Sequence, residues 1–413
     1  MWQLNLFLNI FVEYVNGKGF QNYKFVEENY PYRVKMKRKL LIFLVVFSSV
    51  TLSHAQTPSR YNLSGKIYPL VNKDNSVTFT FYAPSANAVV LSLGRDYMMK
   101  RDKNGIWSVT SDPLVEGFHY YSLKVGGLSF ADPSVYTFYG TSRYSSAVEV
   151  PEDEDGSNWY MPGKNVPRGA VRSVKFWSEV CREYRRMYVY TPAGYEQNPV
   201  RHYPVLYLQH GGGEDESGWI HQGFADVILD NLIAEGKAEH MIIVMNNGYA
   251  SVPDSDDPFS GFDQMMTEEV IPLIDSRYRT INDRNYRAVA GLSWGAKQAY
   301  DLGLGNTNLF SYVGGFSGMI VIGEFNLDTP GFKDPEKLVK AYNGVFKDSL
   351  KFNTEYKLLF IGTGEAEGTL LKDMHGILSG IGIKSTYYVS QNTAHEWLTW
   401  RRSLYTFAQK LFK

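Results

Sequence analysis

The chain has 413 residues, enough for two domains with a sizeable core. Its 42 basic and 43 acidic residues give a formal net charge of −1, and no long run of one sign occurs, so nucleic acid and an anionic membrane surface are disfavoured as partners. The single Cys181 excludes an internal disulfide and a multi-cysteine metal site, and we expect it to fill core space. A small neutral partner or a polysaccharide fits this composition better.

The amino terminus has the features of an export signal. Met36 is followed by a basic start at residues 37–39, an apolar run over residues 40–52 and small residues up to Ala55. Because the apolar run is short for a membrane span and is followed by polar residues, we expect cleavage after Ala55 and release into the periplasm or the cell exterior, with no membrane anchor in the mature form. An uncleaved signal anchor is the alternative. Residues 1–35 are interpreted as an over-long start.

Short alternating segments follow over residues 62–150. Runs such as SVTFTFYAP, AVVLSLG and GFHYYSLKVGG are separated by turn residues, which is typical of a small all-β immunoglobulin-like sandwich. Trp107, Tyr120 and Tyr121 could stack on sugars, but the alternation suits them at least as well to the sandwich core, so we assign no sugar site. Residues 151–167, rich in Pro, Gly and acidic side chains, are predicted to be a linker.

From residue 168 to residue 413, β-like runs alternate with amphipathic stretches of helical length. The expected strands include PVLYLQH, MIIVMNN, YRAVAGL, YVGGFSG, KLLFIGTG and KSTYYVS. Helices are expected over residues 225–235 and 265–274. This alternation predicts a mostly parallel sheet that is covered by helices on both faces.

Gly291, Ser293 and Gly295 form a GxSxG pattern between an expected strand and an expected helix. Composition alone yields such a pattern in about one of four chains of this kind, so only its context gives it weight. On a strand–turn–helix elbow Ser293 would be a nucleophile, and its acid and histidine partners should follow it in the chain.

Two histidines lie downstream of Ser293. His375 falls in an expected helix that ends at Gly380, whereas His395 lies in a loop after the last expected strand, where catalytic residues of parallel sheets collect. We therefore predict that His395 is the general base. An exposed loop histidine is the alternative.

The acid is expected directly after the strand LLFIGTG. Glu367 is the first choice and Glu365 the second, because a carboxylate there would hold the imidazole of His395 in the tautomer that faces Ser293. A negative charge in the first turn of a helix is the alternative explanation for either glutamate, above all for Glu365.

An oxyanion needs two backbone donors aimed where charge develops. One amide is expected from Trp294, next to the nucleophile. The other is expected from the glycine-rich loop after an earlier strand, at Gly212 and Gly213. A flexible turn is the alternative explanation for this glycine run.

The runs YPVLYLQHGGG, EEVIPLIDSRYR, VAGLSWG and HEWLTWRRSLYTFAQKLF resemble the esterase family that holds feruloyl esterases, acetylxylan esterases, esterase D and enterochelin esterase. The resemblance covers roughly residues 168–413. It implies an α/β-hydrolase fold, hydrolysis of carboxylic esters with neither a metal nor a cofactor, and a triad at Ser293, Glu367 and His395.

This chain departs from the family's usual elbow, GLSMGG, at Trp294 and Ala296. The first change bears on the shape of the acyl pocket and the second on the packing of the helix. Residues 77–133 are similar to the early-set β-sandwich that precedes glycogen-branching enzymes and is classed as a carbohydrate-binding module. The pairing of the two parts resembles secreted bacterial feruloyl esterases that act on arabinoxylan.

We therefore expect a secreted serine esterase that releases ferulate or a related acyl group from arabinoxylan-type plant polysaccharide or from small aromatic esters. An enterochelin-type siderophore esterase and an acetylxylan esterase are the alternatives. The near-neutral charge favours a polysaccharide over a triscatecholate, since an anionic siderophore would favour a basic cleft. From another class, a non-catalytic glycan-binding protein is the alternative, against which the ordered triad argues.

Overall fold

The computed structural model describes residues 56–152 and 159–413, and Gln56–Lys413 forms one compact unit. The predicted signal peptide, the over-long start and the middle of the predicted linker lie outside the described residues. Within the described part of the chain, no helix combines the length and the apolar character needed to cross a membrane.

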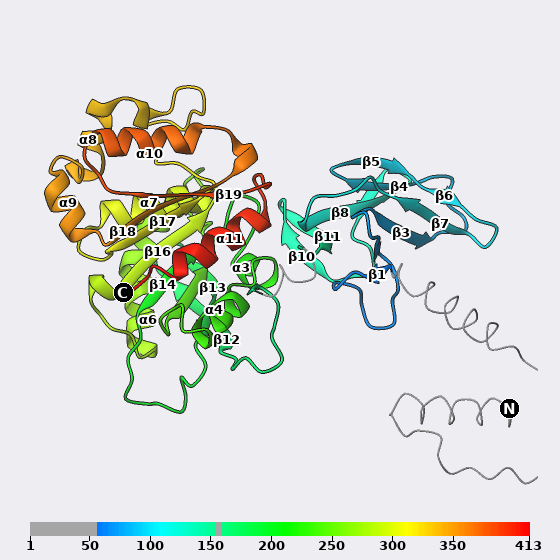
Figure 1. The fold of residues 1–413 in the computed structure, drawn as a ribbon, viewed down its shortest axis with the longest axis horizontal. Helices are drawn as coiled ribbons and strands as arrows, with labels where there is room; N and C mark the ends of the chain where they lie inside the picture. The colour runs from blue at the N-terminus through cyan, green and yellow to red at the C-terminus, as the bar shows by residue number, and fades with distance from the viewer. Residues whose placement is uncertain (1–55, 153–158) are drawn as a thin grey trace, which may run out of the picture. The chain divides into compact units, whose positions relative to one another are not determined.

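Residues 57–150, here called the front region, form two antiparallel sheets (Figure 1). The five-stranded sheet has the order β1 (Thr57–Pro58), β2 (Leu70–Val71), β3 (Val77–Tyr82), β7 (Ile106–Thr110) and β6 (Lys100–Arg101). The six-stranded sheet has the order β10 (Thr137–Gly140), β11 (Arg143–Val150), β8 (Gly117–Val125), β4 (Val89–Leu93) and β5 (Arg95–Met98), with β9 (Leu128–Phe130) beside β8.

Alternation along the strands of the front region places one set of side chains between the two sheets. Val77 and Phe79 of β3 pack there with Leu91 of β4 in one apolar cluster. Trp107 and Tyr121 are buried in the same cluster, so neither presents a ring to a sugar. The neighbouring Tyr120 belongs to a different apolar cluster, which it shares with side chains of the carboxyl-terminal region.

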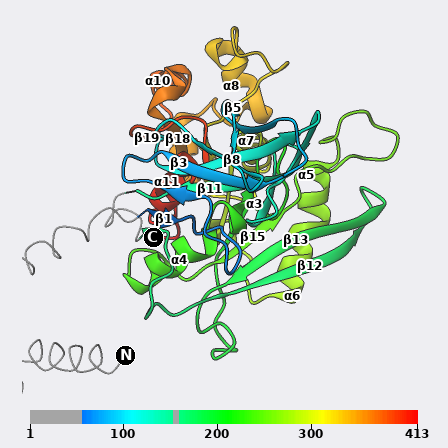
Figure 2. The ribbon, with the colours of Figure 1, turned by 90° about the vertical axis from the view of Figure 1, so that its right-hand side faces the viewer.

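The carboxyl-terminal region is built on an eight-stranded sheet. Its strands lie in the order β12 (Ala170–Ser178), β13 (Glu183–Thr191), β15 (Ile242–Asn246), β14 (Val205–Gln209), β16 (Arg287–Leu292), β17 (Tyr312–Phe316), β18 (Leu358–Gly364) and β19 (Thr386–Ser390). The pairs β12–β13 and β13–β15 are antiparallel, and all later pairs are parallel. Figure 2 shows β12 and β13 as a long two-stranded ribbon. The prediction of a mostly parallel sheet is confirmed.

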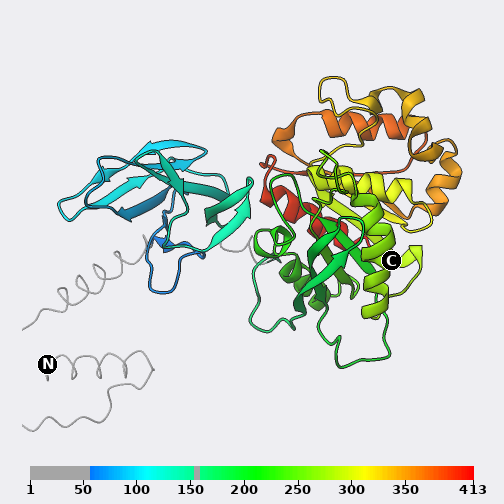
Figure 3. The ribbon, with the colours of Figure 1, turned by 180° about the vertical axis from the view of Figure 1, so that it is seen from behind.

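Helices cover both faces of this sheet (Figure 3), which explains why β14, β15 and β16 are buried along their whole length. One face carries α3 (Gly218–His221), α4 (Ala225–Ala234) and α11 (Trp397–Ala408). The other face carries α5 (Phe262–Gln264), η2 (Met265–Val270), α6 (Ile271–Arg277), α7 (Trp294–Gly305), α8 (Pro335–Gly344), α9 (Ser349–Glu355) and α10 (Leu370–Gly380). Three short 3-10 turns complete the region: η3 (Arg284–Tyr286), η4 (Gly331–Lys333) and η5 (Glu365–Glu367).

Two sequence expectations about this region have clear outcomes. The helix expected over residues 265–274 is present, but its first part, η2, is π-helical and only its second part, α6, is a regular α-helix. Cys181 is buried in the apolar cluster on the α7 side of the sheet, as predicted.

A buried ion pair joins the front region to α11. Nη1 of Arg401 lies 2.6 Å from Oε1 of Glu149, near the end of β11, and its Nη2 lies 3.1 Å from Oε2. The side chains are 0% and 1% exposed. The hydroxyl of Tyr61 donates to Glu149 (2.9 Å), and Nε of Arg401 donates to the carbonyl of Gln222 (2.7 Å). Burial raises the pKa of Glu149, but the Arg401 charge and its hydrogen bonds outweigh burial and hold that pKa below its usual value.

Replacing Glu149 by Gln should lower the free energy of unfolding by about 3–5 kcal/mol, because the Arg401 charge then stays buried without a counter-charge. Urea denaturation measures the loss. Lys124 and Asp96 form a solvent-exposed ion pair and provide the control, since Lys124→Gln should cost far less. Equal losses in the two variants would contradict a structural role for the buried pair.

Candidate active site

Ser293 lies in the sharp turn between β16 and α7, with φ 52° and ψ −118°, a conformation that residues with a side chain rarely adopt. The turn brings backbones very close together. A Cβ atom on Gly291 would lie 2.3 Å from the carbonyl oxygen of Gly295, and one on Gly295 would lie 2.3 Å from the carbonyl oxygen of His210. A side chain at either glycine of the GxSxG pattern would therefore clash with the backbone, which explains why both positions are glycine. The amide of Ser293 donates to the carbonyl of Phe316 on β17 (2.7 Å), which ties the elbow to the neighbouring strand.

The elbow also accommodates Ala296, one of the two departures from the usual pattern. Ala296 is fully buried. A Cβ atom on Gly318 would lie 2.6 Å from the Ala296 methyl group, so this methyl occupies space that Gly318 leaves open. The packing of α7 is thus compatible with alanine at this position.

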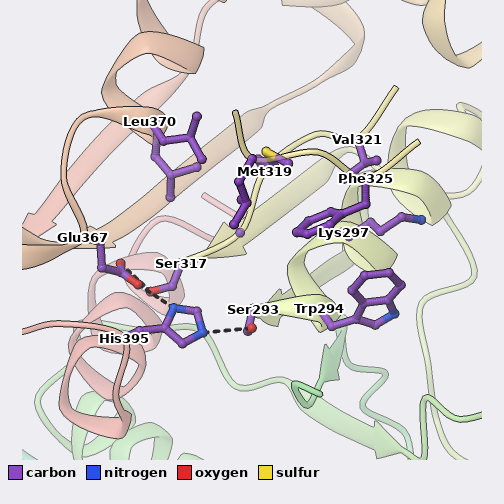
Figure 4. A pocket seen from close by; sticks show the side chains of 13 residues that line it. Ser293, Trp294, Lys297, Ser317, Met319, Val321, Phe325, Glu367, Leu370 and His395 are labelled. Atoms are coloured by element: carbon purple, nitrogen blue, oxygen red, sulfur yellow. Dashed lines mark hydrogen bonds and ion pairs between the residues drawn. The ribbon is translucent and has the colours of Figure 1, made fainter. Parts of the chain in front are cut away.

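His395 lies between Ser293 and Glu367 (Figure 4). Its Nε2 is 2.9 Å from Oγ of Ser293, and its Nδ1 is 2.6 Å from Oε1 of Glu367. An ionised carboxylate only accepts hydrogen bonds, so Nδ1 carries the hydrogen and the lone pair of Nε2 faces the serine hydroxyl. The structure therefore brings together the three residues that the order of motifs in the sequence singled out.

The second oxygen of Glu367 is also fully engaged. Oε2 accepts hydrogen bonds from the hydroxyls of Ser317 (2.8 Å) and Thr363 (2.9 Å) and from the amide of Gly364 (2.7 Å). Burial raises the pKa of Glu367, but the hydrogen bonds from His395, Gly364 and Ser317 outweigh burial and hold that pKa below its usual value. The carboxylate therefore stays ionised at neutral pH. Sequence reasoning missed Ser317 and Thr363.

The other candidates from the sequence lie apart from the hydrogen-bonded series of Glu367, His395 and Ser293. Glu365, the second choice for the acid, accepts from the amide of Asn392 (2.9 Å), and no hydrogen bond of the described residues joins it to His395. His375 lies on α10, where its Nδ1 is 2.7 Å from the hydroxyl of Ser385. This is the helical position expected from the sequence.

The glycine-rich loop after β14 lies directly beside the elbow. A Cβ atom on Gly211 would lie 3.3 Å from Cβ of Ser293, whereas one on Gly212 would meet no atom within 4 Å. The loop therefore packs on Ser293 at Gly211 and leaves open space at Gly212. Trp294 is the first residue of α7, and the first amides of a helix have no partner within the helix. Among the described residues, no hydrogen bond from the amide of Gly212 or of Trp294 is seen.

His210 sets the direction of the Gly212 amide. Nε2 of His210 accepts from the amide of Gly248 (2.9 Å), so its Nδ1 carries the hydrogen, which it donates to the carbonyl of Gly211 (2.8 Å). That carbonyl and the amide of Gly212 point in opposite directions from one planar peptide group. Burial lowers the pKa of His210, which keeps the imidazole neutral and able to accept from Gly248.

Gly213 is held in a different way. Its amide donates to the hydroxyl of Tyr249 (2.5 Å), so this amide already has an acceptor. The geometry thus favours Gly212 over Gly213 as the partner of Trp294 in an oxyanion site. Sequence reasoning placed both glycines in the loop but had no means of placing Tyr249 beside them.

A cavity of about 480 Å³ opens beside Ser293. Apart from the triad, its lining is mostly apolar and includes Trp294, Met319, Val321, Phe325 and Leu370 (Figure 4). The indole of Trp294, the other departure from the usual elbow, stands 4.9 Å from the ring of Phe259 and 5.8 Å from that of Phe325. The bulky side chain of Trp294 therefore forms one aromatic wall of the cavity and leaves the space beside Ser293 open.

A buried carboxyl group lies in the same glycine-rich loop. Oε2 of Glu214 accepts from the amide of Gly211 (3.2 Å), and burial raises the pKa of Glu214 to about 8. The folded protein therefore retains a proton up to about pH 8 that the unfolded chain loses near its ordinary pKa of 4.5. Stability that depends on this proton is present below pH 4.5 and is lost as the pH rises toward 8.

Glu214→Gln should reduce the decline in stability between about pH 5 and pH 8, because glutamine carries no proton to lose. The free energy of unfolding of the wild-type and variant proteins, measured in urea at both pH values, tests this. Glu336→Gln, at a position where the side chain is 86% exposed, is the control and should keep the wild-type slope. An unchanged slope in Glu214→Gln would contradict the assignment.

Comparison with known proteins relates part of this chain to a family of esterases. The family model described as "Putative esterase" matches residues 178–356. The protein "Endo-1,4-beta-xylanase/feruloyl esterase" of Xylanibacter ruminicola is 36% identical over 375 residues, which are 86% of this chain and 47% of the relative. The chain thus spans less than half the length of that relative.

Two solved structures share the fold. A ferulic acid esterase of Anaeromyces mucronatus superposes with a TM-score of 0.52 at 23% identity, covering 62% of this chain and 95% of that chain. The enterobactin esterase of Shigella flexneri superposes with a TM-score of 0.60 at 17% identity, covering 82% of this chain and 94% of that chain. Together with the elbow and the parallel sheet, these likenesses show that the chain has the α/β-hydrolase fold, and the family model matches the esterase family over residues 178–356, which include Ser293.

Proposed function

We propose that this protein is a secreted serine esterase that releases ferulate or a related acyl group from an arabinoxylan-type plant polysaccharide. One observation carries the proposal: the hydrogen-bonded series Glu367, His395 and Ser293 lines a cavity of about 480 Å³ whose other walls are mostly apolar. Export through residues 36–55 is part of the proposal and rests on the sequence pattern alone.

The geometry supports the following course of reaction. Oγ of Ser293 attacks the ester carbonyl carbon while Nε2 of His395 takes the serine proton. Glu367 remains ionised and stabilises the imidazolium that forms. The amides of Trp294 and Gly212 stabilise the oxyanion of the tetrahedral intermediate. His395 then returns the proton to the departing sugar hydroxyl, and water repeats the sequence to free the acid.

The cavity favours an aromatic acyl group. A planar phenylpropenoyl group buries apolar area against walls such as those formed by Trp294, Met319 and Leu370. An acetyl group would fill only a small part of about 480 Å³, so acetylxylan is the weaker candidate. The name of the Xylanibacter relative, which includes feruloyl esterase, agrees with this choice.

The charge around the cavity bears on the siderophore alternative. A triscatecholate is highly anionic and would favour several cationic groups. Among the lining residues, Lys297 is the one lysine or arginine, and its ammonium group already lies 2.5 Å from Oδ2 of Asp301. This pairing supports a neutral aromatic ester over a siderophore.

The direct experiment measures hydrolysis of methyl ferulate, feruloylated arabinoxylan, acetylated xylan and enterobactin by protein that starts at Gln56. Release of ferulate supports the proposal. Turnover of acetyl esters without ferulate release would move the substrate to acetyl groups, and enterobactin cleavage alone would make the protein a siderophore esterase. Inactivity on every ester would favour a non-catalytic glycan-binding protein.

Ser293→Ala should abolish hydrolysis of every substrate in this panel, because it removes the attacking oxygen. The fold should persist, since the alanine side chain retains Cβ and the backbone contacts of the elbow are unchanged. Ester release and thermal denaturation of the variant measure the two expectations. Turnover retained in Ser293→Ala would contradict the proposed nucleophile.

Glu367→Gln should reduce kcat by about 10³- to 10⁴-fold, because an amide group can donate to Nδ1 and so favour the wrong tautomer of His395. Glu365→Gln, two residues away and bonded to the Asn392 amide instead, should leave kcat close to that of the wild type. Steady-state kinetics on methyl ferulate compares the two. The reverse pattern would assign the acid to Glu365.

A further inference from the structure

The hairpin of β10 and β11 in the front region ends in a two-residue turn formed by Thr141 and Ser142. The strand ladder pairs Gly140 with Arg143, so the two turn residues lie outside it. Their φ angles are 55° and 61°, in the left-handed region that Gly and Asn adopt far more readily than Thr or Ser. A turn of this kind persists where surrounding contacts hold it.

One such contact joins the turn to the glycine-rich loop of the active site. The amide of Ser142 donates to the carbonyl of Gly213 over 2.8 Å. A Cβ atom on Gly213, whose φ is 77°, would lie 3.2 Å from the nitrogen of Ser142 and 3.3 Å from Cα of Thr141. The two backbones are therefore packed directly against each other, with no side chain between them.

A second contact holds the same hairpin independently of the turn. Gln222 follows α3, the helix after the glycine-rich loop, and is fully buried. Its Nε2 donates to the carbonyl of Tyr139 and to the hydroxyl of Tyr120, each over 2.9 Å. Since the carbonyl of Gln222 accepts from Arg401, the hairpin is anchored by the buried ion pair as well.

The result for the active site is that Gly213 is held on both sides. Its carbonyl accepts from Ser142 of the front region, and its amide donates to Tyr249 of the carboxyl-terminal region. Both peptide groups of Gly213 are thereby fixed in direction. The next residue toward the amino terminus is Gly212, whose amide is one of the two donors in the proposed oxyanion site.

We propose that Ser142 is a positioning residue of the esterase site: its backbone amide fixes Gly213 and, through it, the Gly212 amide. The inference rests on the proposed ester hydrolysis, since it assigns part of the oxyanion site to the front region. Ser142 is not among the residues that line the cavity beside Ser293, so we expect it to affect the rate of reaction and not the binding of a small ester.

Ser142→Pro removes the donating N–H, and its ring cannot adopt the positive φ of the turn. We expect kcat on methyl ferulate to fall by about 10- to 100-fold, as a shift of the loop of up to about 1 Å would cause, with little change in KM. The Ki of phenylboronic acid, whose tetrahedral adduct on serine carries an oxyanion-like oxygen, should rise in parallel.

A matched control exists in the same region. Gly126 and Gly127 form the two-residue turn between β8 and β9, with φ angles of 57° and 84°, and a Cβ atom on either would meet nothing within 4 Å. Gly127→Pro places the same ring at the second position of a similar turn, where an added Cβ atom meets no neighbour within 4 Å. Gly127→Pro should lower thermal stability, because the proline ring cannot adopt the positive φ there, and should leave kcat, KM and the boronate Ki unchanged.

If Ser142→Pro does not fold, the same test is made with a backbone ester, placing an α-hydroxy acid at position 142 and, as control, at position 127. This replaces only the N–H by oxygen. A selective loss of kcat at 142 supports the inference. Equal kinetics at 142 and 127 in a protein that hydrolyses esters would overturn it, while a wild-type protein inactive on every ester would instead overturn the proposed function.

Discussion

The active site depends on the close approach of two backbones, the elbow after β16 and the glycine-rich loop after β14. Gly295 passes so near the carbonyl of His210 that no side chain fits between them, and the left-handed Ser293 turns its hydroxyl out of that contact. This contact fixes the position of Ser293 relative to the glycine-rich loop. Strands β14 and β16 are neighbours in the sheet, so the parallel register delivers both loops to the same edge.

Hydrogen bonds to backbone groups organise this site more than charge does. His210 orients one peptide group of the glycine-rich loop, and Tyr249 and Ser142 orient the two that follow. Among Ser293, His395 and Glu367, only Glu367 is ionised at rest. Its four hydrogen bonds stabilise the carboxylate form and fix the orientation of the carboxylate. A site of this kind needs little reorganisation when charge develops on the substrate.

The sequence predicted what depends on local pattern and chain order. The structure brings Ser293 of the elbow, the loop histidine His395 and Glu367 after β18 together, and each could be predicted as a site residue because it occupies a fixed place relative to a strand. Ser317 and Thr363 escaped notice because their role comes from the alignment of β17 with β18, which no local pattern encodes. The turn at Thr141 and Ser142 lacks the Asn-Gly or Asp-Gly signature of its class, so its left-handed backbone was not foreseeable.

The ion pair between Glu149 and Arg401 has a consequence for how such proteins can be recombined. The two residues are separated by 252 positions in the chain, and both side chains are buried, so water cannot solvate either charge if its partner is lost. If the front region is exchanged for a homologous one, the new region must supply a carboxylate at the position of Glu149. Otherwise the guanidinium group of Arg401 stays buried without a counter-charge. The boundary between the two regions is therefore a poor site for domain exchange, although it looks like an ordinary domain boundary.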